Sequence, residues 1–89
     1  MKQRSKANRM KSNSIRYNEL ARAKVQSNRS LVISECSRGG YTIAQQLEVK
    51  EEKHTMNVFL KGALHIDDLQ GLYNLRDALN VAIERQEKE

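Results

Sequence analysis

The chain contains no proline and no tryptophan, and only four of its 89 residues are aromatic. It therefore offers no polyproline segment for docking and no indole ring for stacking on a base. The one cysteine, Cys36, cannot form a disulfide within the chain, and no histidine or second cysteine stands at the spacing of a catalytic or zinc site. We expect Cys36 to be a half-buried strand residue and the protein to be cytoplasmic.

Long apolar segments are also missing, and no run approaches the roughly 18 residues of a membrane span. The basic segment 2–11 is not followed by the apolar core of a signal peptide. His65, Asp67 and Asp68 have poor spacing for a metal site or for acid–base catalysis. The Gly39-Gly40 pair does not precede a helix as a phosphate-binding loop would. We therefore expect no membrane association, no metal or cofactor, and no enzymatic activity.

Charge is distributed unevenly along the chain. Residues 1–29 carry nine basic side chains and one acidic one, whereas residues 30–89 carry seven basic and ten acidic ones, which gives net charges of +8 and −3. A cationic segment joined to a mildly acidic, strongly patterned one is typical of a protein whose arm meets a polyanion. The sequence thus predicts a basic flexible arm, residues 1–29, and a compact domain, residues 30–89.

Within the arm, residues 1–12 have no hydrophobic periodicity and are expected to be disordered. From residue 13 onward the apolar side chains fall at helical spacing, which predicts a short amphipathic helix over residues 13–26 that is marginal by itself. The apolar stripe of this helix consists of Tyr17, Leu20, Ala21 and Val25. Residues 27–30 are expected to form a hinge.

The domain is predicted to be α+β, with the element order β-β-β-α. Apolar and polar residues alternate along three segments, which indicates a three-stranded antiparallel sheet. The segments are 31–36, 41–50 and 54–61, separated by turns at 37–40 and 51–53. After Gly62, residues 63–66 form a short extended stretch that leads to the helix.

The C-terminal helix is predicted from about Asp68 to about Gln86, with Asp67 as N-cap and Gln70 as its partner in a capping box. Its apolar stripe is expected to cover the sheet. The stripe consists of Leu69, Leu72, Leu75, Leu79, Ala82 and Ile83. A single copy does not obviously bury Phe59, Tyr73 and Val81, so these three are candidates for a subunit contact in a homodimer.

The basic arm is the feature with the clearest functional meaning, because each cation that neutralises a phosphate releases counterions and strengthens binding to nucleic acid. Such contacts position a protein without reading sequence. An acidic protein partner and an inert solubilising tail are the alternatives. The candidate phosphate contacts are Lys2, Arg4, Lys6, Arg9, Lys11, Arg16, Arg22, Lys24 and Arg29.

The outer face of the predicted sheet is a second candidate surface for a single strand, because aromatic rings can stack on bases while cations follow the backbone. Its residues are Thr42, Gln46, Lys50, Thr55, Asn57, Phe59 and Lys61. With only one aromatic ring, and with Glu48 on the same face, we favour a solvated face or a dimer seam over a binding platform.

The layout of a basic, serine-containing tail, an antiparallel sheet and one long C-terminal helix resembles that of the small single-stranded-DNA-binding coactivators. The resemblance is one of architecture, since no motif in residues 30–89 matches position by position and three strands are expected here where that family has four. It implies a small α+β module that binds nucleic acid, and it assigns no binding residues.

The leading hypothesis is a non-enzymatic nucleic-acid-binding accessory or regulatory protein that dimerises and presents cationic arms. The alternative is a protein-interaction module, for example a phage or mobile-element regulator or inhibitor of a host protein. In that case the segment 13–26 would dock through Tyr17, Leu20, Ala21 and Val25.

Overall fold

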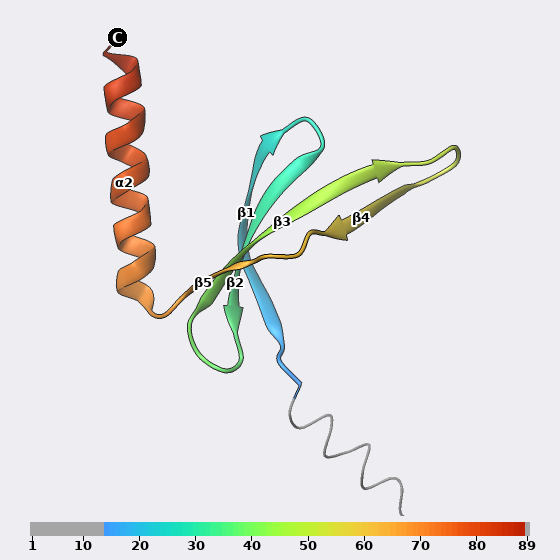
Figure 1. The fold of residues 1–89 in the computed structure, drawn as a ribbon, viewed down its shortest axis with the longest axis horizontal. Helices are drawn as coiled ribbons and strands as arrows, with labels where there is room; N and C mark the ends of the chain where they lie inside the picture. Colours follow the sequence, from blue (N-terminus) through green and yellow to red (C-terminus); the bar gives the residue numbers. More distant parts are fainter. Residues whose placement is uncertain (1–13, 89) are drawn as a thin grey trace, which may run out of the picture.

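The computed structural model describes residues 14–88, which form one antiparallel sheet followed by one helix (Figure 1). The elements are β1 (Tyr17–Gln26), β2 (Arg29–Cys36), β3 (Tyr41–Lys50), β4 (Thr55–Phe59), β5 (Leu64–Ile66) and α2 (Leu69–Glu87). The strands lie in the order β1-β2-β3-β4, and β5 also pairs with β3. The α+β class and the C-terminal helix are confirmed, but the sheet has five strands, not three. The disorder expected of residues 1–12 lies outside the described residues.

Strand β1 replaces the short helix that the sequence predicted over residues 13–26. It pairs with β2, and the register shifts between Glu19 and Ala21 and again between Lys24 and Gln26. Leu20 and Val25 are therefore extra residues at two irregularities of the bulge type, each of which interrupts the alternation of a strand. These interruptions leave the apolar residues of β1 at a spacing that imitates a helix. The helix prediction was wrong for this reason.

The register gives the sheet two chemically different faces, because residues directly opposite each other on paired strands point to the same side. We call them the apolar face and the polar face. The apolar face carries Leu31, Ile33, Ile43, Leu47, Val49, Met56, Val58, Leu64 and Ile66. The polar face carries Tyr17, Glu19, Arg22, Lys24, Ser30, Val32, Ser34, Thr42, Gln46, Glu48, Lys50, Thr55, Asn57 and Phe59.

The junction between β5 and α2 is tightly packed. Asp68 caps the helix by accepting a hydrogen bond from the Gly71 N–H at 3.1 Å, so the cap lies one residue after the predicted Asp67. Gly71 has no room for a side chain, since a Cβ there would lie 2.5 Å from Cγ2 of Ile66. The side chain that ends β5 thus rests directly on the first turn of α2, with only residues 67 and 68 between the two elements.

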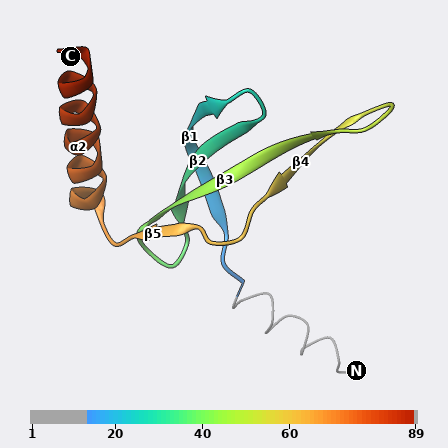
Figure 2. The ribbon, with the colours of Figure 1, turned by 45° about the horizontal axis from the view of Figure 1, so that its top comes forward.

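The helix does not cover the sheet, contrary to expectation. It stands beside the sheet and contacts it mainly at β5, as both views show (Figures 1 and 2). No residue of α2 is buried. Among residues 14–88 only Val32, 2 % exposed, and Ser34, 8 % exposed, are buried, and both belong to the polar face. The short link and the contact between Ile66 and Gly71 hold the helix in this direction.

The turn between β2 and β3 provides a test of how closely β5 is packed. Gly39 and Gly40 both have positive φ, at +106° and +79°, but a Cβ on Gly40 would lie 2.6 Å from the Ile66 carbonyl oxygen whereas a Cβ on Gly39 would meet nothing within 4 Å. We expect Gly39→Ala to lower the free energy of unfolding by roughly 1–2 kcal/mol through backbone strain alone. Gly40→Ala should cost about 1–3 kcal/mol more because of overpacking. Urea unfolding of both variants measures the difference, and equal losses would contradict the packing.

Candidate nucleic-acid interface

The structure separates the nine predicted phosphate contacts. Lys2, Arg4, Lys6, Arg9 and Lys11 lie outside the described residues. Arg29 is half-buried and donates from Nη1 to Oε1 of Gln45 at 3.1 Å; in the register these two residues share a face with Leu31 and Leu47, opposite the polar face. Arg16 precedes β1 and is exposed. Of the described cations predicted to bind phosphate, only Arg22 and Lys24 therefore belong to the polar face.

Arg22 is held in place by two neighbours on this face. Its guanidinium forms a two-pronged ion pair with Glu19, in which Nε and Nη2 each donate over 2.8 Å, and Nη1 donates to Oε1 of Gln46 at 2.8 Å. These hydrogen bonds lower the pKa of the Glu19 carboxyl and raise the pKa of Arg22. The ion pair lies within β1, and the hydrogen bond to Gln46 reaches over β2 to β3. Because the Arg22 guanidinium is already bonded to these neighbours, less of its charge is available to a phosphate.

Two aromatic rings stand on the polar face. Tyr17 at the start of β1 is 57 % exposed and Phe59 at the end of β4 is 56 % exposed. They border one hollow of about 400 Å³, whose other walls include Lys61 and the polar strand residues Ser34 and Thr42. The two rings come from opposite edges of the sheet and meet this hollow from both sides. The sequence-based prediction had only Phe59 here.

A second hollow of about 250 Å³ continues the polar face toward the β1–β2 turn. It is lined by Arg22, Lys24, Ser27, Asn28, Arg29, Ser30, Gln46, Glu48 and Asn57. Gln46 of β3 pairs with Phe59 of β4, which places the two hollows next to each other along the sheet. Aromatic surface, amide groups and cations therefore follow one another over a single face.

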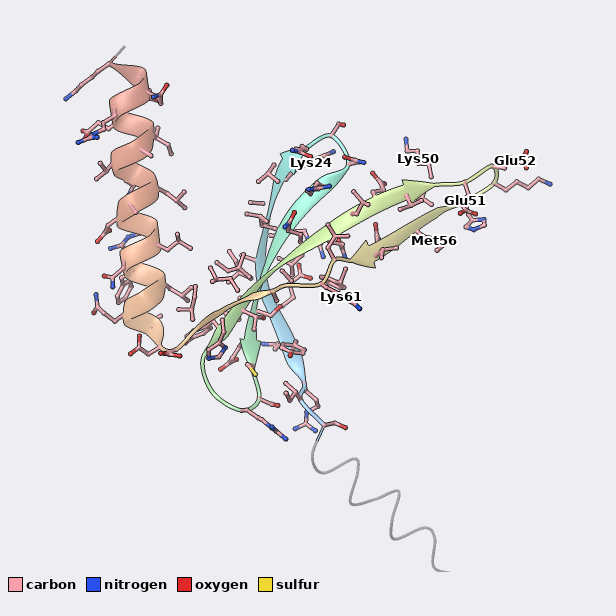
Figure 3. All side chains as sticks on the ribbon, viewed as in Figure 1. Lys24, Lys50, Glu51, Glu52, Met56 and Lys61 are labelled. Carbon is pink, nitrogen blue, oxygen red and sulfur yellow. The ribbon has the colours of Figure 1, made fainter. Side chains whose placement is uncertain are left out.

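Lysines are spread around this face. Figure 3 shows Lys24 on the β1–β2 hairpin, Lys50 toward the β3–β4 turn and Lys61 after β4. Two carboxylates belong to this region. Glu19 is paired with Arg22. Glu48 lines the second hollow, and within the described residues no cation is bonded to it. The face therefore combines three lysines with one unpaired carboxylate.

The sequence could not identify Tyr17 as part of this surface because the residue appeared to belong to a helical stripe. In β1 the members of that stripe are divided, since Leu20 and Val25 occupy the irregular positions and Ala21 lies opposite Ile33 on the apolar face. The one signal for a strand was the alternation of Arg22 and Lys24 with the alanines at 21 and 23. The predicted docking helix is absent from the described chain.

Other candidate sites are accounted for by simple contacts. His65 lies with Nε2 3.4 Å from Oδ1 of Asp67, and both side chains are exposed. Cys36 is a half-buried residue of β2, as predicted. Within residues 14–88 there is no group of three or more His, Cys, Asp or Glu side chains that could hold a metal ion, and no helix long and apolar enough to cross a membrane.

The ion pair of Arg22 can be tested by titration. The carboxyl carbon of Glu19, followed by NMR, should titrate below the ordinary range of a glutamate, and Arg22→Gln should raise its pKa. Because the folded-state pKa is lowered, the stabilisation from this pair is present above the unfolded-state pKa and is lost as the pH falls through the folded-state pKa. Lys24→Gln is the control and should leave the Glu19 titration nearly unchanged. An unshifted Glu19 in the unmodified protein would contradict the contact.

The polar face is thus an open sheet surface with two exposed rings, two adjoining hollows and several cations. Such a surface can accept planar groups on its rings and anionic groups on its lysines. Comparison of the chain with protein-family models, with curated proteins and with solved structures finds no match.

Proposed function

We propose that this protein is a non-enzymatic nucleic-acid-binding accessory protein, and that it binds a single strand across the polar face. The observation that carries the proposal is the placement of Tyr17 and Phe59, both more than half exposed, on the same sheet face as Lys24 and Lys50, with Lys61 in the wall of the first hollow. Exposed rings on a folded surface lose hydrophobic stabilisation unless something covers them. Unpaired bases are flat apolar partners attached to phosphates, and fit both features of the face.

A single strand suits this face better than a duplex. Stacking on Tyr17 or Phe59 needs a base whose flat surface is free, and in a duplex both surfaces are covered by neighbouring base pairs. The amides of Gln46 and Asn57 lie between the rings and the β1–β2 turn, where they can donate to and accept from base edges. Lys24 and Lys61, at the two hollows, are then phosphate contacts.

The basic residues before β1 add to the affinity without adding selectivity. Lys2, Arg4, Lys6, Arg9 and Lys11 are five cations within eleven residues. Tethered next to the strand that carries Tyr17, they are available to phosphates beyond the sheet at high effective concentration. The combination of a weakly selective sheet face and a cationic segment fits an accessory or regulatory role.

The stacking contribution can be measured with fluorescent single-stranded oligonucleotides. We expect Tyr17→Ala and Phe59→Ala each to weaken binding about 10-fold to 100-fold, because stacking contributes about 1–3 kcal/mol per base. Tyr17→Phe and Phe59→Tyr keep the rings and serve as matched controls that should stay within about threefold of the unmodified protein. Full affinity in both alanine variants would refute stacking on this face.

The electrostatic contribution is separable through its dependence on salt. Replacing Lys2, Arg4, Lys6, Arg9 and Lys11 by glutamine should reduce the slope of log affinity against log salt by up to about 3.5, or about 0.7 for each phosphate contact on a single strand. Lys24→Gln should reduce it by about 0.7, and Lys88→Gln at the far end of α2 should not change it. No binding to single-stranded or duplex DNA or RNA at low salt would reject nucleic acid as the ligand and leave a protein partner.

A further inference from the structure

Two apolar surfaces of the described chain have no cover. One is the apolar face of the sheet, where Leu64, Met56 and Val58 are exposed and the central strands are only half-buried. The other is the stripe of α2, which consists of Leu69, Leu72, Leu75, Leu79, Ala82 and Ile83. Leu79 is 54 % exposed and Ile83 is 53 % exposed. A sheet and a helix are each stable in water only when their apolar sides are packed against another element.

The helix of one copy is held away from the sheet of the same copy. Asp68 fixes the first turn by its bond to the Gly71 N–H, and Ile66 packs onto Gly71 with no space between them. Only residues 67 and 68 separate β5 from α2, so this packed junction sets the direction in which the 19-residue helix leaves the sheet. Both views show α2 standing apart from β1–β4 (Figures 1 and 2).

The two surfaces nevertheless match in length and chemistry. The 19 residues of α2 span about 28 Å at 1.5 Å per residue. The 10 residues of β3 span about 33 Å at 3.3 Å per residue. On the apolar face, Ile33 and Ile43 of the central strands and Val49, Met56 and Val58 toward β4 are aliphatic, as is the helix stripe along its length. Arg29 and Gln45 share this face and are bonded to each other.

We propose that the apolar face of the sheet is covered by α2 of a second copy of this chain, in a two-fold dimer whose copies exchange their helices. Two-fold symmetry makes each copy provide one helix and receive one, so both open surfaces are closed in both copies at once. The proposal does not depend on nucleic-acid binding. It leaves both polar faces outside the contact.

The area of this contact is large enough for an interface between two copies. A helix about 28 Å long and about 10 Å wide covers roughly 280 Å² of a sheet. Counting both surfaces of two such contacts gives roughly 1,100 Å² of buried area, which clears the roughly 1,000 Å² expected of a biological interface. Of the three residues that the sequence offered for a subunit contact, Tyr73 borders the helix stripe, Val81 lies on the other side of α2, and Phe59 belongs to the polar face.

The test compares two charged substitutions on the same helix. Leu79 in the stripe and Val81 on the other side are almost equally exposed, at 54 % and 51 %. We expect sedimentation equilibrium of the full chain to show a dimer, Leu79→Asp to raise its dissociation constant by on the order of 100-fold, and Val81→Asp to leave it within about threefold. A monomeric unmodified chain at micromolar concentration, or equal effects of the two variants, would overturn the proposal.

Mixed labelling shows which copy provides the helix, and it needs no substitution. A dimer made from one isotope-labelled and one unlabelled copy should give intermolecular NOEs from the methyl groups of Leu79 and Ile83 to those of Ile43 and Leu47. If these NOEs occurred only within one copy, the helix would have folded back on its own sheet and the exchange would be refuted. A dimer with NOEs only between the two helices would refute it as well.

Discussion

Strand β3 holds the sheet together, because it is paired along both of its edges. It meets β2 on one side, and on the other it meets β4 with its second half and β5 with its first half. The strict alternation of its ten residues places Ile43, Leu47 and Val49 on one side and Thr42, Gln46 and Glu48 on the other. The pairing of the other strands with β3, directly or through β2, determines which of their side chains lie on each side of the sheet. The division into an apolar and a polar face therefore depends on β3.

The second constraint is the close contact of Ile66 with Gly71. This contact fixes the first turn of α2 against the end of β5. The helix then extends away from the sheet, and none of its residues is buried. A chain of this size has little core to lose, since a domain of about 60 residues buries only about 60 % of its unfolded surface. In the proposed dimer a second copy supplies the layer that one copy lacks, and both polar faces lie outside the contact.

The edge strand β1 changes the composition of the polar face. Without β1, the face would hold one ring and a few amides, which is typical of a solvated sheet. Pairing of β1 with β2 adds Tyr17 across from Phe59 and brings Arg22 into the network with Glu19 and Gln46. The sequence predicted a solvated face here, and the structure adds a second exposed ring, on which the proposed binding of a single strand depends.

The sequence by itself determined the elements with strong local patterns. The alternation in 31–36 and 41–50, the glycines of the turn between them and the stripe of the C-terminal helix all follow from periods of two and 3.6 residues. The tertiary structure decided the rest. Pairing with β2 made residues 17–26 a strand although the irregular positions of Leu20 and Val25 gave their sequence a helical spacing. The helix position depended on one contact between Ile66 and Gly71, because periodicity defines which side of a helix is apolar but not which surface that side meets.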